Sequence, residues 1–167
     1  MTNNGGGTLK DIWTASTYAA AGLYISETET PGRIYAMSLE HHMRTEARFH
    51  NVSNWKIYAF QFEEEGREGV DCHMAEMSGC KNIEMINVWM YRVIRAFMPK
   101  EVGFRIWNCE NIVFRNMHNY TQVLPVIEFP VYDVNKALPV YSWDFARLTI
   151  SVSYTHLRAH ETSLHLV

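Results

Sequence analysis

Two acidic segments of the chain carry residue types that could do acid–base or metal chemistry. The first, SLEHH, spans 38–42 and places Glu40 beside two histidines, and the second, QFEEE, begins at Gln61. A carboxylate near an imidazole can ligate a metal ion or transfer a proton. Glu40 and Glu63 are 23 residues apart. What the two segments could do together depends on the elements that position them.

The chain around and after these segments is repetitive. Three segments, which begin at residues 51, 79 and 108, align without gaps as NVSNWKIYAFQFE, GCKNIEMINVWMY and NCENIVFRNMHNY. One position of the repeat is always asparagine, at spacings of 28 and 29 residues, and several others are always apolar. A fixed period of this length is typical of stacked repeat architectures. The recurrent asparagines are Asn54, Asn82 and Asn111.

The repeat predicts a parallel β-helix. Apolar residues alternate at 55/57, 83/85 and 112/114, as in strands, and no long segment has the periodicity of an amphipathic helix. Asparagine suits the bends between strands, because it tolerates left-handed backbone. A β-sandwich is the alternative, but it would need hairpin signals between the runs, and none occurs there. We therefore expect an all-β, right-handed parallel β-helix over 1–151, truncated at both ends.

Stacking one coil on the next brings Glu40 beside Glu63. With the offset of 23 residues, 37–40 aligns with 60–63. If the apolar residues of these segments point inward, the alternate ones point outward, since successive strand side chains face opposite sides. Two outward columns are then expected. They are Ser38, Gln61, Trp89 and His118 in one column, and Glu40, Glu63, Tyr91 and Tyr120 in the other.

This predicted face combines two carboxylates with aromatic rings. Adjacent coils would hold the carboxyl groups within the range of about 5 to 9.5 Å that glycoside hydrolases use. The like charge and an apolar neighbour such as Phe62 would raise the pKa of one carboxyl, which makes it a candidate general acid. Trp89 and Tyr91 could stack on sugar rings. The alternative is a solvated face without catalytic function.

The segment 22–65 resembles the second β-helix of family 55 glycoside hydrolases, the exo-β-1,3-glucanases or laminarinases, and related pectate-lyase-like proteins. It contains GLY at 22–24, SLEH for the SEH motif of the family and QFE for its QTE motif. The resemblance implies that Glu63 is the general acid of an inverting hydrolase and that Glu40 is its acidic partner. Two departures stand out: a residue is inserted between Ser38 and Glu40, and Phe62 replaces a threonine.

The resemblance also implies a larger parent protein. Its partner is a polysaccharide or oligosaccharide, its location is extracellular or periplasmic, and the groups that position the attacking water lie on a preceding first β-helix. This chain is then expected to be a fragment that is inactive alone, and its start, MTNNGGGTLKD, has no signal-peptide pattern. The segment 152–167 resembles a translated sequencing adapter and is expected to be an unstructured tail.

Composition and charge disfavour other classes of function. The net charge of −3 and the scattered Lys and Arg residues give no basic surface for nucleic acid. No apolar run approaches the roughly 18 to 20 residues of a membrane span. The three cysteines form no CxxC motif, so we expect buried thiols, although Cys80 and Cys109 would stack on adjacent coils.

Alternatives to hydrolysis remain open. A non-catalytic β-helix module that binds glycan or serves as a scaffold would present the same face. A pectate-lyase-type elimination would require a calcium cluster of aspartates, and no such cluster is visible. We expect no cofactor and no metal, because the candidate histidines fall on different faces of the predicted β-helix. They are His41, His42, His50 and His73.

Overall fold

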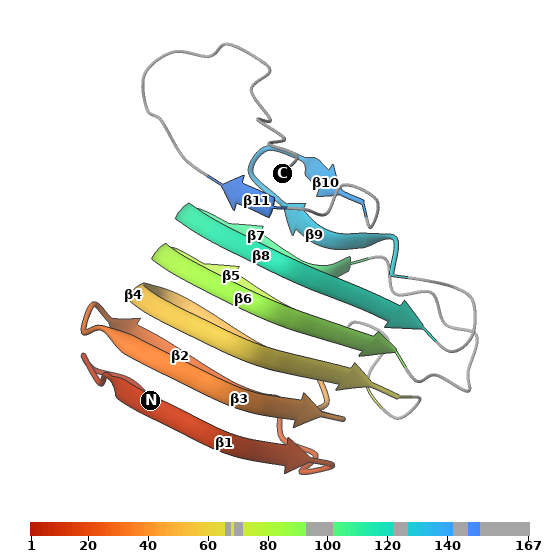
Figure 1. Ribbon diagram of the computed structural model, residues 1–167, viewed down its shortest axis with the longest axis horizontal. Helices are drawn as coiled ribbons and strands as arrows, with labels where there is room; N and C mark the ends of the chain where they lie inside the picture. The colour runs from red at the N-terminus through yellow and green to blue at the C-terminus, as the bar shows by residue number, and fades with distance from the viewer. Residues whose placement is uncertain (66–67, 69–71, 93–101, 122–126, 142–146, 151–167) are drawn as a thin grey trace.

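The computed structural model describes residues 1–65, 68, 72–92, 102–121, 127–141 and 147–150, so the predicted tail at 152–167 lies outside the described residues. Within them the chain is all-β and forms a solenoid of about four turns (Figure 1). The predicted parallel β-helix is confirmed. The described part of the chain contains no helix with the length and hydropathy of a membrane span.

Eleven strands make up the described part. They are β1 (Gly7–Ala15), β2 (Ala21–Thr28), β3 (Gly32–Glu40), β4 (Thr45–Glu64), β5 (His73–Ser78), β6 (Lys81–Arg92), β7 (Val102–Trp107), β8 (Glu110–Thr121), β9 (Phe129–Asp133), β10 (Leu138–Val140) and β11 (Arg147–Ile150).

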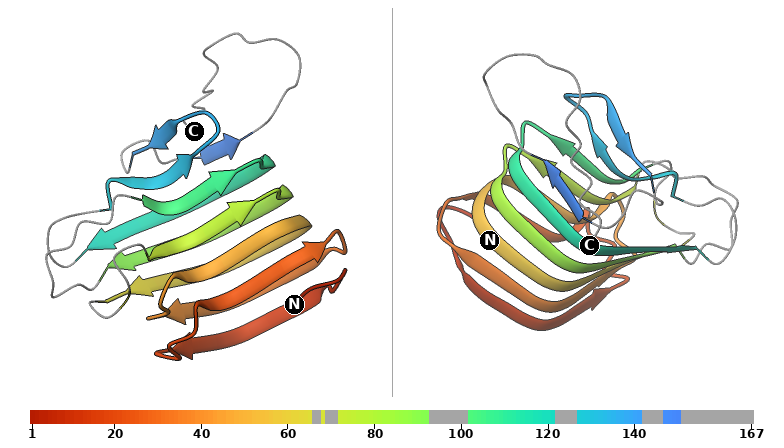
Figure 2. Two further views of the ribbon diagram at one scale, coloured as in Figure 1. Left: turned by 180° about the vertical axis from the view of Figure 1, so that it is seen from behind. Right: turned by 45° about the horizontal axis from the view of Figure 1, so that its top comes forward.

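The strands stack in two layers. The first layer contains β1, β3, the second half of β4, β6 and β8, and the second contains β2, the first half of β4, β5, β7 and β9. All of these pairs are parallel, whereas β11 and β10 add antiparallel strands to the two layers. One coil is a second-layer strand, a corner and a first-layer strand, as Figure 2 shows for the coils that follow one another up the stack.

The corners depend on asparagines in left-handed conformation. Asn54, Asn82 and Asn111 have φ angles of 66°, 53° and 53°. Their amides form a ladder: Nδ2 of Asn82 donates to Oδ1 of Asn54 at 3.1 Å, and Nδ2 of Asn111 donates to Oδ1 of Asn82 at 2.8 Å. Because asparagine adopts positive φ more readily than most residues and stacks its amide on its own kind, it suits this position in the three coils.

A second left-handed position bends the first layer within its strands. Ala59, Asn87 and Asn116 have positive φ at equivalent points of β4, β6 and β8. The bend resets the alternation of faces, so that Ile57 and Phe60 both point inward although they are three positions apart in the sequence. The left-handed residue of each strand therefore determines which side chains after the bend face outward. Strict alternation counted from the corner would not place them correctly.

Aromatic rings fill the space between the layers. Phe60 and Phe62 from the first layer contact each other with ring centroids 4.3 Å apart, and Phe62 contacts Phe104 of the second layer at 5.2 Å. All three are fully buried. Trp55 packs where a Cβ of Gly32 would lie, and its indole nitrogen donates to the Thr30 carbonyl at 3.1 Å. Burial of these large side chains is the main source of stability.

The cysteines behave as the sequence predicts. Cys72, Cys80 and Cys109 are buried free thiols, and Cys80 and Cys109 are stacked at one corner. The backbone nitrogen of Cys80 donates to Sγ of Cys109 at 3.4 Å. This pair belongs to the hydrophobic core.

Two substitutions at Asn82 separate the backbone role of the ladder from its hydrogen bonds. Asn82→Gly keeps the left-handed backbone but loses two amide hydrogen bonds, so we expect a loss of about 1 to 2 kcal/mol in the free energy of unfolding. Asn82→Ala adds the left-handed strain of roughly 1 kcal/mol. Urea denaturation measures both. Equal stability of the two variants would show that strain at this position is negligible.

Candidate functional site

The pairing register brings the predicted columns together. Glu40 pairs with Glu63, and Glu63 pairs with Tyr91, which pairs with Tyr120. In the other column, Ser38, Gln61, Trp89 and His118 follow one another in the same way. The intervening side chains of Leu39 and Phe62 are buried, so both columns face outward. The predicted arrangement of all eight side chains on one face is confirmed.

Gln61 joins the two carboxylates. Its Nε2 donates to Oε1 of Glu40 at 3.3 Å and to Oε2 of Glu63 at 3.4 Å. These two oxygens can be no farther apart than the sum of the two distances. The two carboxylates are therefore no farther apart than the paired carboxyl groups of glycoside hydrolases, which are separated by about 5 to 5.5 Å in retaining enzymes and about 6.5 to 9.5 Å in inverting ones. Ser38 Oγ also donates to Oε1 of Glu40, at 2.8 Å, and so orients that carboxylate.

The environment favours the protonated form of Glu63. Burial is the main cause of its raised pKa, and the negative charge of Glu40 acts in the same direction. Glu65 also raises the pKa, while His41 and the hydrogen bond from Gln61 oppose the shift. A carboxyl that keeps its proton above the usual pH range is suited to general acid catalysis.

An aromatic platform continues the face beyond the carboxylates. It consists of Trp89, Tyr91, His118 and Tyr120. The rings of Trp89 and His118 are stacked with centroids 3.8 Å apart, and those of Trp89 and Tyr91 are nearly parallel at 6.1 Å. Trp89 is 39% exposed and Tyr120 is 52% exposed. Since His118 covers one face of the indole, a planar ligand can stack only on the parts of the platform that remain open.

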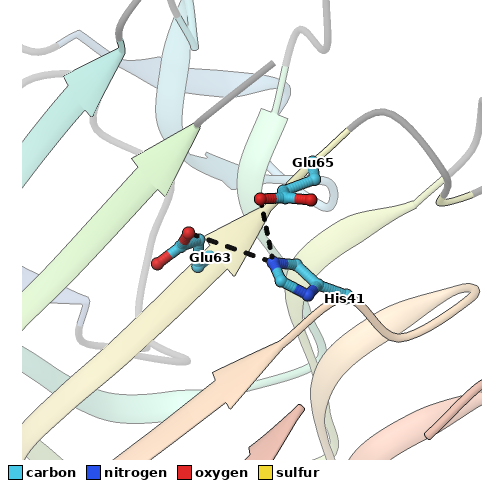
Figure 3. A group of neighbouring side chains, drawn as sticks. All are labelled: His41, Glu63 and Glu65. Carbon is cyan, nitrogen blue, oxygen red and sulfur yellow. Dashed lines mark ion pairs between the residues drawn. The ribbon is translucent and has the colours of Figure 1, made fainter. Parts of the chain in front are cut away.

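His41 and Glu65 lie beside Glu63 and were missed as site residues (Figure 3). Nε2 of His41 is 3.9 Å from Oε1 of Glu63 and 3.6 Å from Oε1 of Glu65. His41 has a φ of 62°, directly after β3 ends. The left-handed turn directs its ring toward β4, which strand alternation does not predict. Only Glu65 could have been expected at the site from the sequence, because it follows Glu63 by two residues and therefore lies on the same face.

The other histidines lie elsewhere. His42 is fully buried and forms a close contact with Glu46, with the ring packed against Gly22. Burial is the main cause of its lowered pKa. Nδ1 of His50 lies 2.7 Å from the hydroxyl of Ser78. The sequence prediction that the histidines point in different directions is therefore correct for His42 and His50, but it overlooked the position of His41.

The apolar residues within the two acidic segments belong to the core. Phe62 is fully buried, contacts Phe60 and does not enter the outward face. Leu39 is also buried, and it separates Ser38 from Glu40 so that both face outward and hydrogen-bond to each other.

A hollow of about 230 Å³ lies at the strand ends beside this site. His41 and Glu65 contribute to it, and Tyr18 at its rim is exposed. The complete lining is Ser16, Tyr18, His41, Met43 and Glu65.

The comparisons with known proteins give no match. No family model matches the chain, and neither a curated protein nor a solved structure matches it significantly. The function must therefore be argued from the site itself.

The raised pKa of Glu63 predicts a pH-dependent gain in stability for Glu63→Gln. Between the ordinary glutamate pKa and the raised one, the folded state binds more protons than the unfolded state, so the free energy of unfolding falls as pH rises. The glutamine variant lacks this loss. We expect it to be more stable than the native chain at pH 8, with the difference shrinking toward about pH 4.

Urea unfolding at the two pH values measures this difference. Glu110→Gln is the control, because Glu110 is also in the first layer and its carboxylate pairs with Lys81 at 3.6 Å. A gain for Glu63→Gln that does not change with pH would contradict the assignment.

Proposed function

We propose that this chain is part of a carbohydrate-active β-helix protein that hydrolyses a β-1,3-glucan or related polysaccharide. The proposal rests above all on one observation: Gln61 holds Glu40 and Glu63 together on an outward face. The raised pKa of Glu63 and the adjacent aromatic platform support it. The resemblance to family 55 glycoside hydrolases adds the substrate class.

In this proposal Glu63 acts as the general acid. Its proton passes to the glycosidic oxygen as the bond to the leaving sugar breaks, which avoids an unstable alkoxide. Glu40 lies beside it, oriented by Ser38 and Gln61, and its negative charge helps Glu63 to keep its proton. In an inverting reaction the attacking water lies on the opposite face of the sugar, and the groups that position it are expected on the first β-helix that the resemblance implies.

The aromatic platform would bind the sugar chain next to the acids. The C–H faces of a pyranose ring pack on aromatic surfaces, and Trp89 and Tyr91 present nearly parallel rings one coil after Gln61 and Glu63 in the same columns. The exposure of Trp89 and Tyr120 also favours a second candidate function. A non-catalytic glycan-binding module would use the same platform without proton transfer by Glu63.

Glycan binding can be tested with the chain alone. Laminari-oligosaccharides are titrated into the protein in a calorimeter, and Trp89→Ala is expected to weaken binding at least tenfold because a stacking surface is lost. Tyr35→Ala is the matched control, since Tyr35 is also an outward aromatic of the first layer but stacks on Tyr58 before the bend. Absence of binding, or equal binding by Trp89→Ala, would overturn this role for the platform.

Hydrolysis is tested in the complete protein that the resemblance implies. Glu63→Gln is expected to lower kcat for laminarin by about 10² to 10⁴, the usual contribution of a general acid, while oligosaccharide binding persists. Circular dichroism establishes that the variant is folded. Binding of glycan by the native protein without any hydrolysis would instead identify the non-catalytic module.

A further inference from the structure

We propose that His41, Glu63 and Glu65 form a binding site for a divalent cation of the zinc type. Their candidate ligand atoms, one from each side chain, all lie within 4.8 Å of one another. Figure 3 shows the ring nitrogen of His41 directed toward the two carboxylates, which extend from the end of β4. Metal binding at this site is a function separate from the proposed hydrolysis. Of the pair Glu40 and Glu63, only Glu63 is a proposed metal ligand.

Nε2 of His41 is buried and has no hydrogen-bond partner. Its distances of 3.6 and 3.9 Å to the carboxylate oxygens exceed the roughly 2.7 to 3.2 Å of a hydrogen bond. A cation that binds nitrogen and oxygen at about 2.0 to 2.2 Å would fit between these atoms after a small contraction, and it would satisfy the nitrogen.

The other ring nitrogen of His41 has a hydrogen-bond partner that holds the ring in place. Nδ1 lies 3.1 Å from the hydroxyl of Ser16. When Nδ1 donates to this oxygen, the lone pair of the neutral imidazole is on Nε2 and faces the carboxylates. Metal-ligating histidines are commonly held by such a second hydrogen bond, which fixes both the ring orientation and the tautomer.

The surroundings of the site are rich in carboxylates. Glu40, Glu63 and Glu65 form a cluster of negative charge, and Glu68 accepts a hydrogen bond from the backbone of Glu65 at 2.7 Å. In the described part of the chain, no lysine or arginine forms an ion pair with Glu40, Glu63 or Glu65. A bound divalent cation would offset the repulsion between these carboxylates.

The ligand types select the cation. Calcium and magnesium prefer oxygen ligands alone, whereas zinc readily binds imidazole nitrogen together with carboxylate oxygen. Three protein ligands leave a coordination position open, as in catalytic zinc sites. The hollow beside the site, to which His41 and Glu65 contribute, is large enough for a water or another small ligand.

Zinc would also affect the proposed acid. A carboxylate that ligates a cation is held ionised, so zinc-bound Glu63 cannot donate a proton. Zinc is therefore expected to inhibit any hydrolysis that depends on Glu63. Binding itself depends on His41 and Glu65, which have no part in the proposed proton transfer, so the metal site and the hydrolase proposal can fail separately.

The test is a calorimetric titration of chelator-treated protein with Zn²⁺. We expect one ion per chain and a rise in Tm on saturation. His41→Ala and Glu65→Gln should each weaken binding at least tenfold, and Ser16→Ala by about 10- to 100-fold, as for other residues that support a ligand. Circular dichroism and the Tm of each metal-free variant show whether it is folded.

Two controls address other histidines. His50→Ala should bind zinc like the native chain, because His50 also pairs with a glutamate, Glu27, at 3.4 Å, but has no second carboxylate in an ion pair among the described residues. A chain with His156, His160 and His165 replaced by alanine should also bind normally. Loss of binding in this last chain would assign the zinc to the C-terminal segment and overturn the proposal.

Spectroscopy of the cobalt-loaded chain tests the ligand set. Visible ligand-field bands without a thiolate-to-cobalt charge-transfer band are expected, since the proposed ligands are nitrogen and oxygen only. A charge-transfer band would point to the cysteines and contradict the site. So would the absence of zinc binding, or equal affinity of the native chain and of folded His41→Ala and Glu65→Gln.

Discussion

Left-handed backbone at recurring positions of the coils is the constraint on which the rest of the structure depends. The corner asparagines, such as Asn82, and the mid-strand residues, such as Ala59, make successive strands bend at equivalent points. A slip of one residue would break the amide ladder and turn core side chains outward. The position of Glu40 beside Glu63 follows from this register, because each outward side chain lies over its counterpart in the next coil.

The site combines this rigid register with unfavourable local electrostatics. Glu63 is partly buried beside like charges, and burial raises its pKa. Gln61 and Ser38 offset part of the cost by donating hydrogen bonds to the carboxylates. Such a cluster lowers stability at neutral pH, and a chain with no use for it would gain by replacing one acid. The arrangement is typical of functional sites, where stability is commonly sacrificed.

The sequence predicted the columns because apolar residues repeat in the same frame as the asparagines, so the offset between Glu40 and Glu63 could be aligned directly. It did not reveal the bend at Ala59, since alanine rarely adopts positive φ and nothing in its side chain signals it. His41 was missed for the same reason: its left-handed turn after β3 redirects the ring. Phe62 looked like a change in a site motif, whereas it belongs to the core.

The asparagine ladder has a further consequence for how such a protein can vary. Its rungs recur after 28 and 29 residues, whereas Glu40 and Glu63 are separated by only 23. Coils of unequal length therefore share one register, and most of the difference is taken up by the connections that leave the first layer, near His41 and Glu65. Insertions at that edge would reshape the surroundings of the site while the stack stays in place. The corners between the two layers, by contrast, differ by only one residue between the coils of β3 and β4.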